Sequence, residues 1–202
     1  LVVFNSLYIK RKQQIEKVHA SIQEINSLVL EHNMMISDFF TYDTKNQQFF
    51  ETGFSHYLEQ QNEQYQLIRN KVLQLHHLES IHRFQLHSTI NEIIIDLDLY
   101  KAYIDRIVDL IMQRGFQDYG VEGEMRDYIH QLENIPSINL SRVLMLRRHE
   151  KDYIIRNNEK YISKLLSLSK LLDEELESSG LKKDIKESAI QHLSNYVAKF
   201  KL

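Results

Sequence analysis

The sequence predicts an all-α protein, and three observations lead to that prediction. Glycine and proline, which turn-rich β architectures need, number only 5 and 1 in 202 residues. Apolar residues recur at the helical spacings of three, four and seven, and no segment keeps the alternation of a strand for long. No low-complexity linker divides the chain. We therefore expect six helices in two bundles stacked end to end, with two long helices crossing both.

The first expected helix covers about residues 5–40. Its apolar stripe follows two heptad series, Ile15, Ile22, Val29, Ile36 and Val18, Ile25, His32, Phe39. Such sustained sevens indicate long helices packed side by side at shallow angles. A helix of this length spans roughly 50 Å, which is longer than a small globule requires. The stretch "DFFTYDTKNQQFF" (38–50) then predicts a hairpin tip packed by aromatic side chains.

The second expected helix runs from Phe54 to Leu78, and the third covers about residues 81–114. The third contains "EIIIDLDLY" (92–100), the one stretch with strand-like composition. Apolar residues nevertheless continue through it at helical spacings, namely Ile90, Ile94, Leu97, Ile104, Ile107 and Ile111. We therefore expect the helix to persist until Gly115.

The stretch "RGFQDYGVEGEMR" (114–126) holds three of the five glycines, which indicates a shaped connection and not a plain linker. A short helix is expected to follow, to about residue 134, before Pro136 interrupts the chain. The fifth expected helix covers about residues 137–177, and the sixth runs from 181 to the end. The fifth is about as long as the first, so these two are the helices expected to be shared by both bundles.

The stripe of the fifth helix carries charge where burial is expected. Its two heptad series are Leu140, Arg147, Ile154, Tyr161, Leu168 and Leu144, Lys151, Asn158, Leu165, Leu172. An isolated buried charge costs several kcal/mol, so this polar layer must meet a partner. In one interpretation it is a salt-bridge layer that fixes register, with acids such as Glu150, Asp152 and Glu159 within reach. In the other, an arginine faces a cavity and binds a carboxylate or phosphate ligand through two hydrogen bonds.

Three stretches resemble one known family. They are "GVEGEMRDYIHQLE" (120–133), "LMLRRHEKDYIIRNNEKY" (144–161) and the FF-x-T-G-x-S-x-Y-L pattern of residues 49–58. With them the chain resembles the helical bimodular sensor domain of bacterial chemoreceptors and sensor histidine kinases. The resemblance extends over essentially the whole chain and is most specific between about residues 114 and 165.

The resemblance implies a function as well as a fold. Residues 1–202 would form a single extracytoplasmic sensor domain made of a membrane-proximal and a membrane-distal helical module, built from six helices as two stacked four-helix bundles. It would lie on the periplasmic face of a bacterial inner membrane, tethered through flanking membrane helices outside this fragment, and would dimerise in the full receptor. Its ligand would be a small organic acid, or its partner a periplasmic binding protein. Arg126, Arg147 and Arg148 fall in the motif stretches and are the ligand-binding candidates.

The amino-terminal sequence "LVVFNSLYIKRKQQ" changes from apolar to basic within about ten residues. A chain that has just left a membrane helix has this pattern, and an ordinary amphipathic helix start explains it equally well. No run of residues approaches the roughly 20 apolar positions of a membrane span.

Other function classes find less support. A net charge of −3 without a basic cluster argues against a nucleic-acid partner, and the absence of cysteine excludes thiolate chemistry. A di-iron bundle needs two Glu-x-x-His motifs, and Glu79 to His82 is the single one present. The sequence carries no nucleophile elbow and no phosphate loop. We therefore expect no enzyme, no metal and no cofactor.

Histidines and aromatic residues remain to be interpreted. His76, His77, His82 and His87 do not share one helix face by spacing and are expected at the surface or its boundary. His32, within the apolar series, is expected to be a hydrogen-bonded core residue and not a ligand or a pH switch. Phe39, Phe40, Phe49, Phe50 and Phe54 are expected to be core residues. A helical scaffold without a small-molecule ligand is the second function class, and it gives no reason for a cavity beside Arg147.

Overall fold

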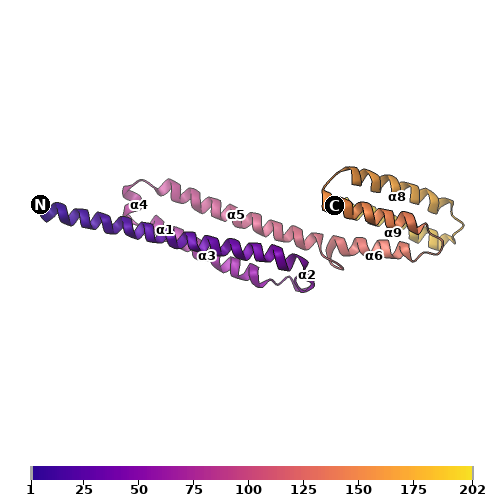
Figure 1. The fold of residues 1–202 in the computed structure, drawn as a ribbon, viewed down its shortest axis with the longest axis horizontal. Helices are drawn as coiled ribbons and strands as arrows, with labels where there is room; N and C mark the ends of the chain where they lie inside the picture. Colours follow the sequence, from indigo (N-terminus) through magenta and orange to yellow (C-terminus); the bar gives the residue numbers. More distant parts are fainter. Residues whose placement is uncertain (1, 202) are drawn as a thin grey trace. The chain divides into compact units, whose positions relative to one another are not determined.

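The computed structural model describes the backbone of residues 2–201 and the side chains of residues 4–201, so Leu1 and the side chains of Val2 and Val3 in the apolar start lie outside this described part. All regular secondary structure of the described chain is helical (Figure 1), which confirms the all-α prediction. In order, they are α1 (Val2–Tyr42), the 3-10 helix η1 (Asp43–Lys45), α2 (Gln47–Thr52), α3 (His56–His76), α4 (Glu79–Arg83), α5 (His87–Arg114), α6 (Gly120–Glu133), α7 (Leu140–Arg156), α8 (Lys160–Ser178) and α9 (Lys183–Phe200). Within residues 2–201 these nine α-helices replace the expected six.

The helices divide into two compact units. Unit 1 is Leu1–Met112 and unit 2 is Gln113–Leu202, so the boundary falls in the last turn of α5. Each unit has a hydrophobic core of its own.

In unit 1, α1 packs along α3, and the short α4 contacts both of them. The predicted long first helix is confirmed by the 41 residues of α1. Its second heptad series faces inward, with Val18 and Ile25 half-buried and His32 and Phe39 buried. Helix α5 joins the same core through apolar side chains of its first three turns, Ile90, Ile94 and Leu97. The long first helix thus follows directly from its heptad pattern.

The aromatic stretch forms the expected hairpin tip between α1 and α3. Phe49 contacts both Phe39 and Phe50 edge to face, with ring centroids 5.2 Å apart in each pair. Gly53 then ends α2 with a left-handed backbone (φ +71°), and the Ser55 hydroxyl caps α3 by accepting a hydrogen bond from the Leu58 amide at 3.2 Å. The FF-x-T-G-x-S pattern therefore encodes a helix stop followed by a helix start. Of the five phenylalanines expected in the core, Phe40 and Phe54 are instead exposed.

The expected third helix is interrupted near its beginning. Gln85 has a left-handed backbone (φ +57°), and the chain turns between α4 and α5. The turn closes because the Leu86 amide donates to the Ile81 carbonyl at 3.0 Å while the Ile81 side chain is buried against α3. Burial of this one isoleucine holds α4 in place, and periodicity alone did not reveal the break.

Unit 2 is a four-helix bundle in which α6 contacts α7 and α9, and α8 contacts the same two helices. Its core residues come from all four helices and are Met125, Ile129, Leu132, Val143, Leu146, Leu165, Leu172, Leu176, Ala189, Leu193 and Tyr196.

The prediction of a single fifth helix over residues 137–177 is wrong. Asn157 adopts a left-handed conformation (φ 45°, ψ 49°) that ends α7, and the Asn158 side chain accepts from the Lys160 amide at 3.1 Å where α8 starts. Asparagine tolerates this backbone better than most residues. The segment is therefore a helical hairpin within unit 2 and no helix shared by both units.

Candidate functional site

The glycine-rich connection fixes where α6 begins. Gly115 has a φ of +82°, and a Cβ at this position would overlap the Tyr119 carbonyl. A Cβ at Gly123 would overlap the backbone of Asp118. The connection is therefore folded tightly against the first turn of α6, as its glycines predicted. In this position the Asp118 carboxylate lies 3.3 Å from the Arg126 guanidinium.

Two stretches that carry the family resemblance pack against each other in unit 2. Residues 120–133 form α6, and residues 144–156 belong to α7, which contacts it. The Arg147 guanidinium donates to the Glu133 carboxylate at 2.8 Å, and the Lys151 ammonium lies 3.4 Å from Glu122. These cross-helix pairs join the two stretches into one charged cluster.

The cluster reaches the core through Glu150. This residue is only 6% exposed, and its carboxylate accepts a 2.7 Å hydrogen bond from the Tyr196 hydroxyl of α9. The Lys151 ammonium lies 3.3 Å from the same carboxylate. Burial and the negative charge of Glu150 raise the pKa of Tyr196 far above its usual range, so the hydroxyl stays protonated and donates. The buried contact joins α7 to α9, and the more exposed pair of Lys151 with Glu122 connects α7 to α6.

The polar layer expected along the fifth helix does not exist as a continuous stripe. The heptad register ends at Asn157, and Leu144 and Ile154 are exposed. The buried face of α7 instead follows Val143, Leu146 and Glu150, with spacings of three and four. The buried charge is therefore Glu150, which the sequence offered only as a partner for the arginines. The 3.6-residue period, counted from Val143, was the signal that could have found it.

The three candidate arginines occupy different environments. Arg147 is partly buried and paired with Glu133 of α6, an acid that the salt-bridge interpretation had not named. Arg126 is paired with Asp118 and has 37% of its side chain exposed. Arg148 has 71% exposed and lies 3.9 Å from Asp152 on its own helix. The structure therefore does not gather the three guanidinium groups around one point.

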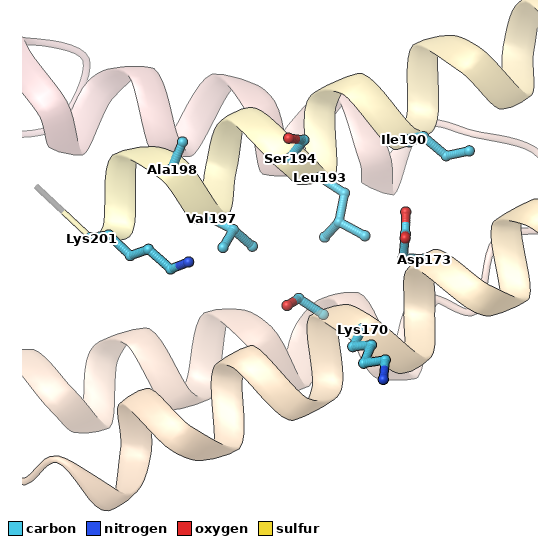
Figure 2. Close-up of a pocket in the computed structure, with 9 residues that line it drawn as sticks. Lys170, Asp173, Ile190, Leu193, Ser194, Val197, Ala198 and Lys201 are labelled. Atoms are coloured by element: carbon cyan, nitrogen blue, oxygen red, sulfur yellow. The ribbon is translucent and has the colours of Figure 1, made fainter.

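A groove of unit 2 lies between α8 and α9 and has a volume of about 660 Å³. Figure 2 shows Leu193 and Val197 of α9 pointing into it, while the Lys170 ammonium of α8 points away. Lys201 extends toward the groove at one end. The three candidate arginines are absent from its lining, so the groove and the charged cluster are separate features.

Unit 1 holds a second polar cluster, formed by α1, α3 and α5. His32 is 2% exposed, and its Nε2 lies 2.8 Å from the Gln61 amide nitrogen, so Gln61 donates and His32 accepts. Burial lowers the pKa of His32, which favours the neutral ring that this bond requires. The prediction of a hydrogen-bonded core histidine is thus confirmed. Tyr65 lies one turn after Gln61 on α3, and its hydroxyl donates to the Asp98 carboxylate of α5 at 2.6 Å. Arg69 of α3 donates to the same carboxylate at 2.9 Å.

A comparison of the chain with models of known protein families, with curated proteins and with solved structures finds no match. Among the described residues, no three histidine, aspartate or glutamate side chains are arranged to hold a metal ion. The helices of residues 2–201 also include none that is both long and apolar enough to cross a membrane.

Proposed function

We propose that this chain is the ligand-sensing input domain of a transmembrane signalling receptor, facing the extracytoplasmic side of a bacterial inner membrane. The parent would be a sensor histidine kinase or a methyl-accepting chemotaxis receptor, tethered by flanking helices and dimeric in the membrane. The domain itself would perform no catalysis. In the full receptor its two units would be the membrane-proximal and membrane-distal modules, stacked as the resemblance implies.

The observation that carries this proposal is the meeting of the two most family-like stretches in one charged cluster. Helix α6 supplies Glu133 and helix α7 supplies Arg147. Helix α9 joins the cluster because its Tyr196 hydroxyl donates to Glu150 of α7. A pair of opposite charges that is only partly buried can exchange partners at modest cost. A small organic anion would replace the Glu133 carboxylate on Arg147, whose planar guanidinium group can bind a carboxylate through two hydrogen bonds.

Such an exchange would have a structural consequence. Glu133 belongs to α6 and Arg147 to α7, so a ligand that takes the arginine releases a contact between these helices. Ligand binding shifts a packing equilibrium only by its differential affinity for the two packings. The proposed signal is therefore a small change in the packing of α6 and α7 that the bundle transmits to neighbouring helices.

A thermal-shift screen of the whole chain against small organic acids, amino acids and amines tests the proposal. A ligand at 100 times its dissociation constant stabilises the folded chain by about 2.7 kcal/mol, which is visible as a higher Tm. We expect hits among carboxylates, lost in Arg147→Ala or Arg126→Ala and retained in Arg156→Ala. Arg156 is the matched control because it lies on α7, as Arg147 does, and pairs with Asp152 of the same helix while 61% of its side chain is exposed. Hits that survive both arginine substitutions would contradict the assigned site.

The second candidate function is a partner-binding or scaffold module without a small-molecule ligand. It is favoured by exposed apolar side chains at heptad spacing on α1, including Ile15 and Ile22. A screen without any carboxylate hit, together with unchanged stability in Arg147→Ala, would favour this alternative. A periplasmic binding protein would then be the partner to test by direct titration.

A further inference from the structure

Four histidines of unit 1 gather where α3, α4 and α5 meet. His76 is the last residue of α3, His77 follows it, His82 lies in α4, and His87 begins α5. His77 and His82 are exposed, and His76 and His87 are half-buried, as expected for surface or boundary residues. Their grouping was not expected, because it depends on the break between α4 and α5. We call these four residues the histidine corner.

The rings of the histidine corner are close enough to interact directly. His87 Nδ1 lies 3.3 Å from His76 Nε2, and the centroids of these rings are 4.6 Å apart. The His82 ring lies 5.2 Å from His87, and the His77 ring lies 5.6 Å from His76. A hydrogen bond between two imidazole nitrogens requires that one of them lack a proton. The contact between His76 and His87 therefore cannot survive protonation of both rings.

The surroundings offer little compensation for positive charge. On α4, the Glu79 carboxylate is engaged by Arg83 at 2.9 Å and by Gln14 of α1 at 3.2 Å. On α5, Glu92 accepts from the Ser88 hydroxyl. The α1 side chains that line a groove with Ile81 of α4 include one titratable residue, His19, and no carboxylate. In the described part of the chain, no carboxylate oxygen lies within 4.0 Å of a nitrogen of the four rings.

The histidine corner lies where α4 and the start of α5 are attached to α3, so positive charge there would weaken this attachment. Helix α4 has only five residues and is held by the buried Ile81 and by the Leu86 amide that bonds to the Ile81 carbonyl. The first turn of α5 adds Ile90 to the same core. Repulsion between His76, His82 and His87 would therefore act directly on the segment that attaches α4 and the start of α5 to α3.

We propose that the histidine corner is a proton-operated joint, closed at neutral pH and loosened in mild acid, when positive charge on neighbouring rings breaks the contact between His76 and His87. Burial, followed by the charges of His76 and His82, lowers the pKa of His87, which agrees with a corner that resists full protonation. A histidine whose pKa is lower in the folded than in the unfolded chain contributes stability above its ordinary pKa of about 6.5, and that contribution is lost as the pH falls. Loosening is therefore expected on acidification and not on alkalinisation.

Hydrogen exchange of the whole chain, measured by NMR from about pH 7.5 to about pH 5.5, tests this joint. The opening equilibrium changes tenfold per pH unit for each proton taken up, so a net uptake of half a proton across this range corresponds to about a tenfold change. After correction for intrinsic exchange rates, we expect about a tenfold loss of protection in residues 81–90. Unit 2 amides serve as an internal reference and should change less.

The matched variants are His76→Gln, His82→Gln and His87→Gln combined, against His56→Gln as a control. His56 begins α3, away from the corner, and 66% of its side chain is exposed. The triple variant should lose the pH-dependent change in protection, while the control should retain it. If the triple variant does not fold, the imidazole titrations of the wild-type chain decide, because interacting rings give broad, coupled curves. Independent titration of all four rings, or an unchanged pH response in the folded triple variant, would overturn the proposal.

The joint does not depend on the proposed ligand. It resides in unit 1, whereas the carboxylate site is assigned to Arg126 and Arg147 in unit 2. A pH response with no carboxylate hit, or a carboxylate hit with no pH response, would therefore distinguish failure of one proposal from failure of the other.

Discussion

The two units solve the problem of burying helical faces to different extents. In unit 2, four helices of similar length surround one core, and Leu146, Leu165 and Leu172 are completely buried. In unit 1, three long helices surround a thinner core, and Ile15 and Ile22 remain about half exposed. Both units carry apolar residues at helical spacing, so the difference lies in the number of helices around the core. Four helices close a ring around their apolar stripes, and three long ones leave part of each stripe uncovered.

Separating the two units should have the largest effect. A fragment of residues 113–202 should retain its helical circular dichroism and unfold cooperatively, because a closed core of this size can fold alone. A fragment of residues 1–112 should unfold less cooperatively or self-associate through its uncovered stripes. Thermal unfolding at several protein concentrations checks both. A monomeric, cooperative unit 1 beside an unfolded unit 2 would reverse the comparison.

The next largest effect is expected in the closed core. Leu172→Ala should lower the free energy of unfolding by about 2–5 kcal/mol, because Leu172 is fully buried and its removal leaves a cavity. Leu171→Ala is the matched control, because Leu171 is the neighbour of Leu172 and is 49% exposed. This substitution should lower the free energy of unfolding by roughly 0.5 kcal/mol or less. Urea denaturation measures both values. Equal losses in the two variants would show that α8 does not face the core as described.

Deleting one hydroxyl from each unit compares their polar contacts. Tyr196→Phe should cost about 1–3 kcal/mol, because it leaves the buried Glu150 carboxylate without its tyrosine donor. Tyr65→Phe should cost about 0.5–1.5 kcal/mol, because Asp98 is partly exposed and keeps its contact with Arg69. The same denaturation experiment ranks them. A larger loss for Tyr65→Phe would contradict the assignment of the more deeply buried contact to unit 2.

The smallest expected effects concern the candidate arginines of α7. Arg147→Ala should lower the free energy of unfolding by up to about 1 kcal/mol, since its pair with Glu133 is partly screened by solvent. Arg148→Ala should change it by roughly 0.5 kcal/mol or less, because this side chain is largely exposed. If both variants match the wild-type chain in stability and in carboxylate binding, neither arginine has the role expected of it.

Local signals predicted the longer helices α1, α3, α5, α6 and α9, but not α2, α4 or the break between α7 and α8. The heptads of α1 and the folded connection at Gly115 were predicted, and both depend on residues that are neighbours in sequence. The stop at Gly53 and the start at Ser55 are equally local but were not predicted. The backbone preferences of serine and glycine act at that range, so a sequence alone suffices to read them. The arginine candidates came from a resemblance, and their role remains to be tested.

The places where the chain changes direction could be found only from the tertiary structure. Asn157 and Gln85 sit in stretches whose apolar spacing would suit an unbroken helix, and each turns the chain through one left-handed residue. These turns bury Glu150 beside Tyr196 and bring His76 beside His87. The sequence by itself determined that this protein is helical and that a glycine-rich, folded connection precedes α6. Which polar groups meet was decided by packing, because the small backbone cost of one left-handed residue is outweighed by the apolar surface that the turn buries.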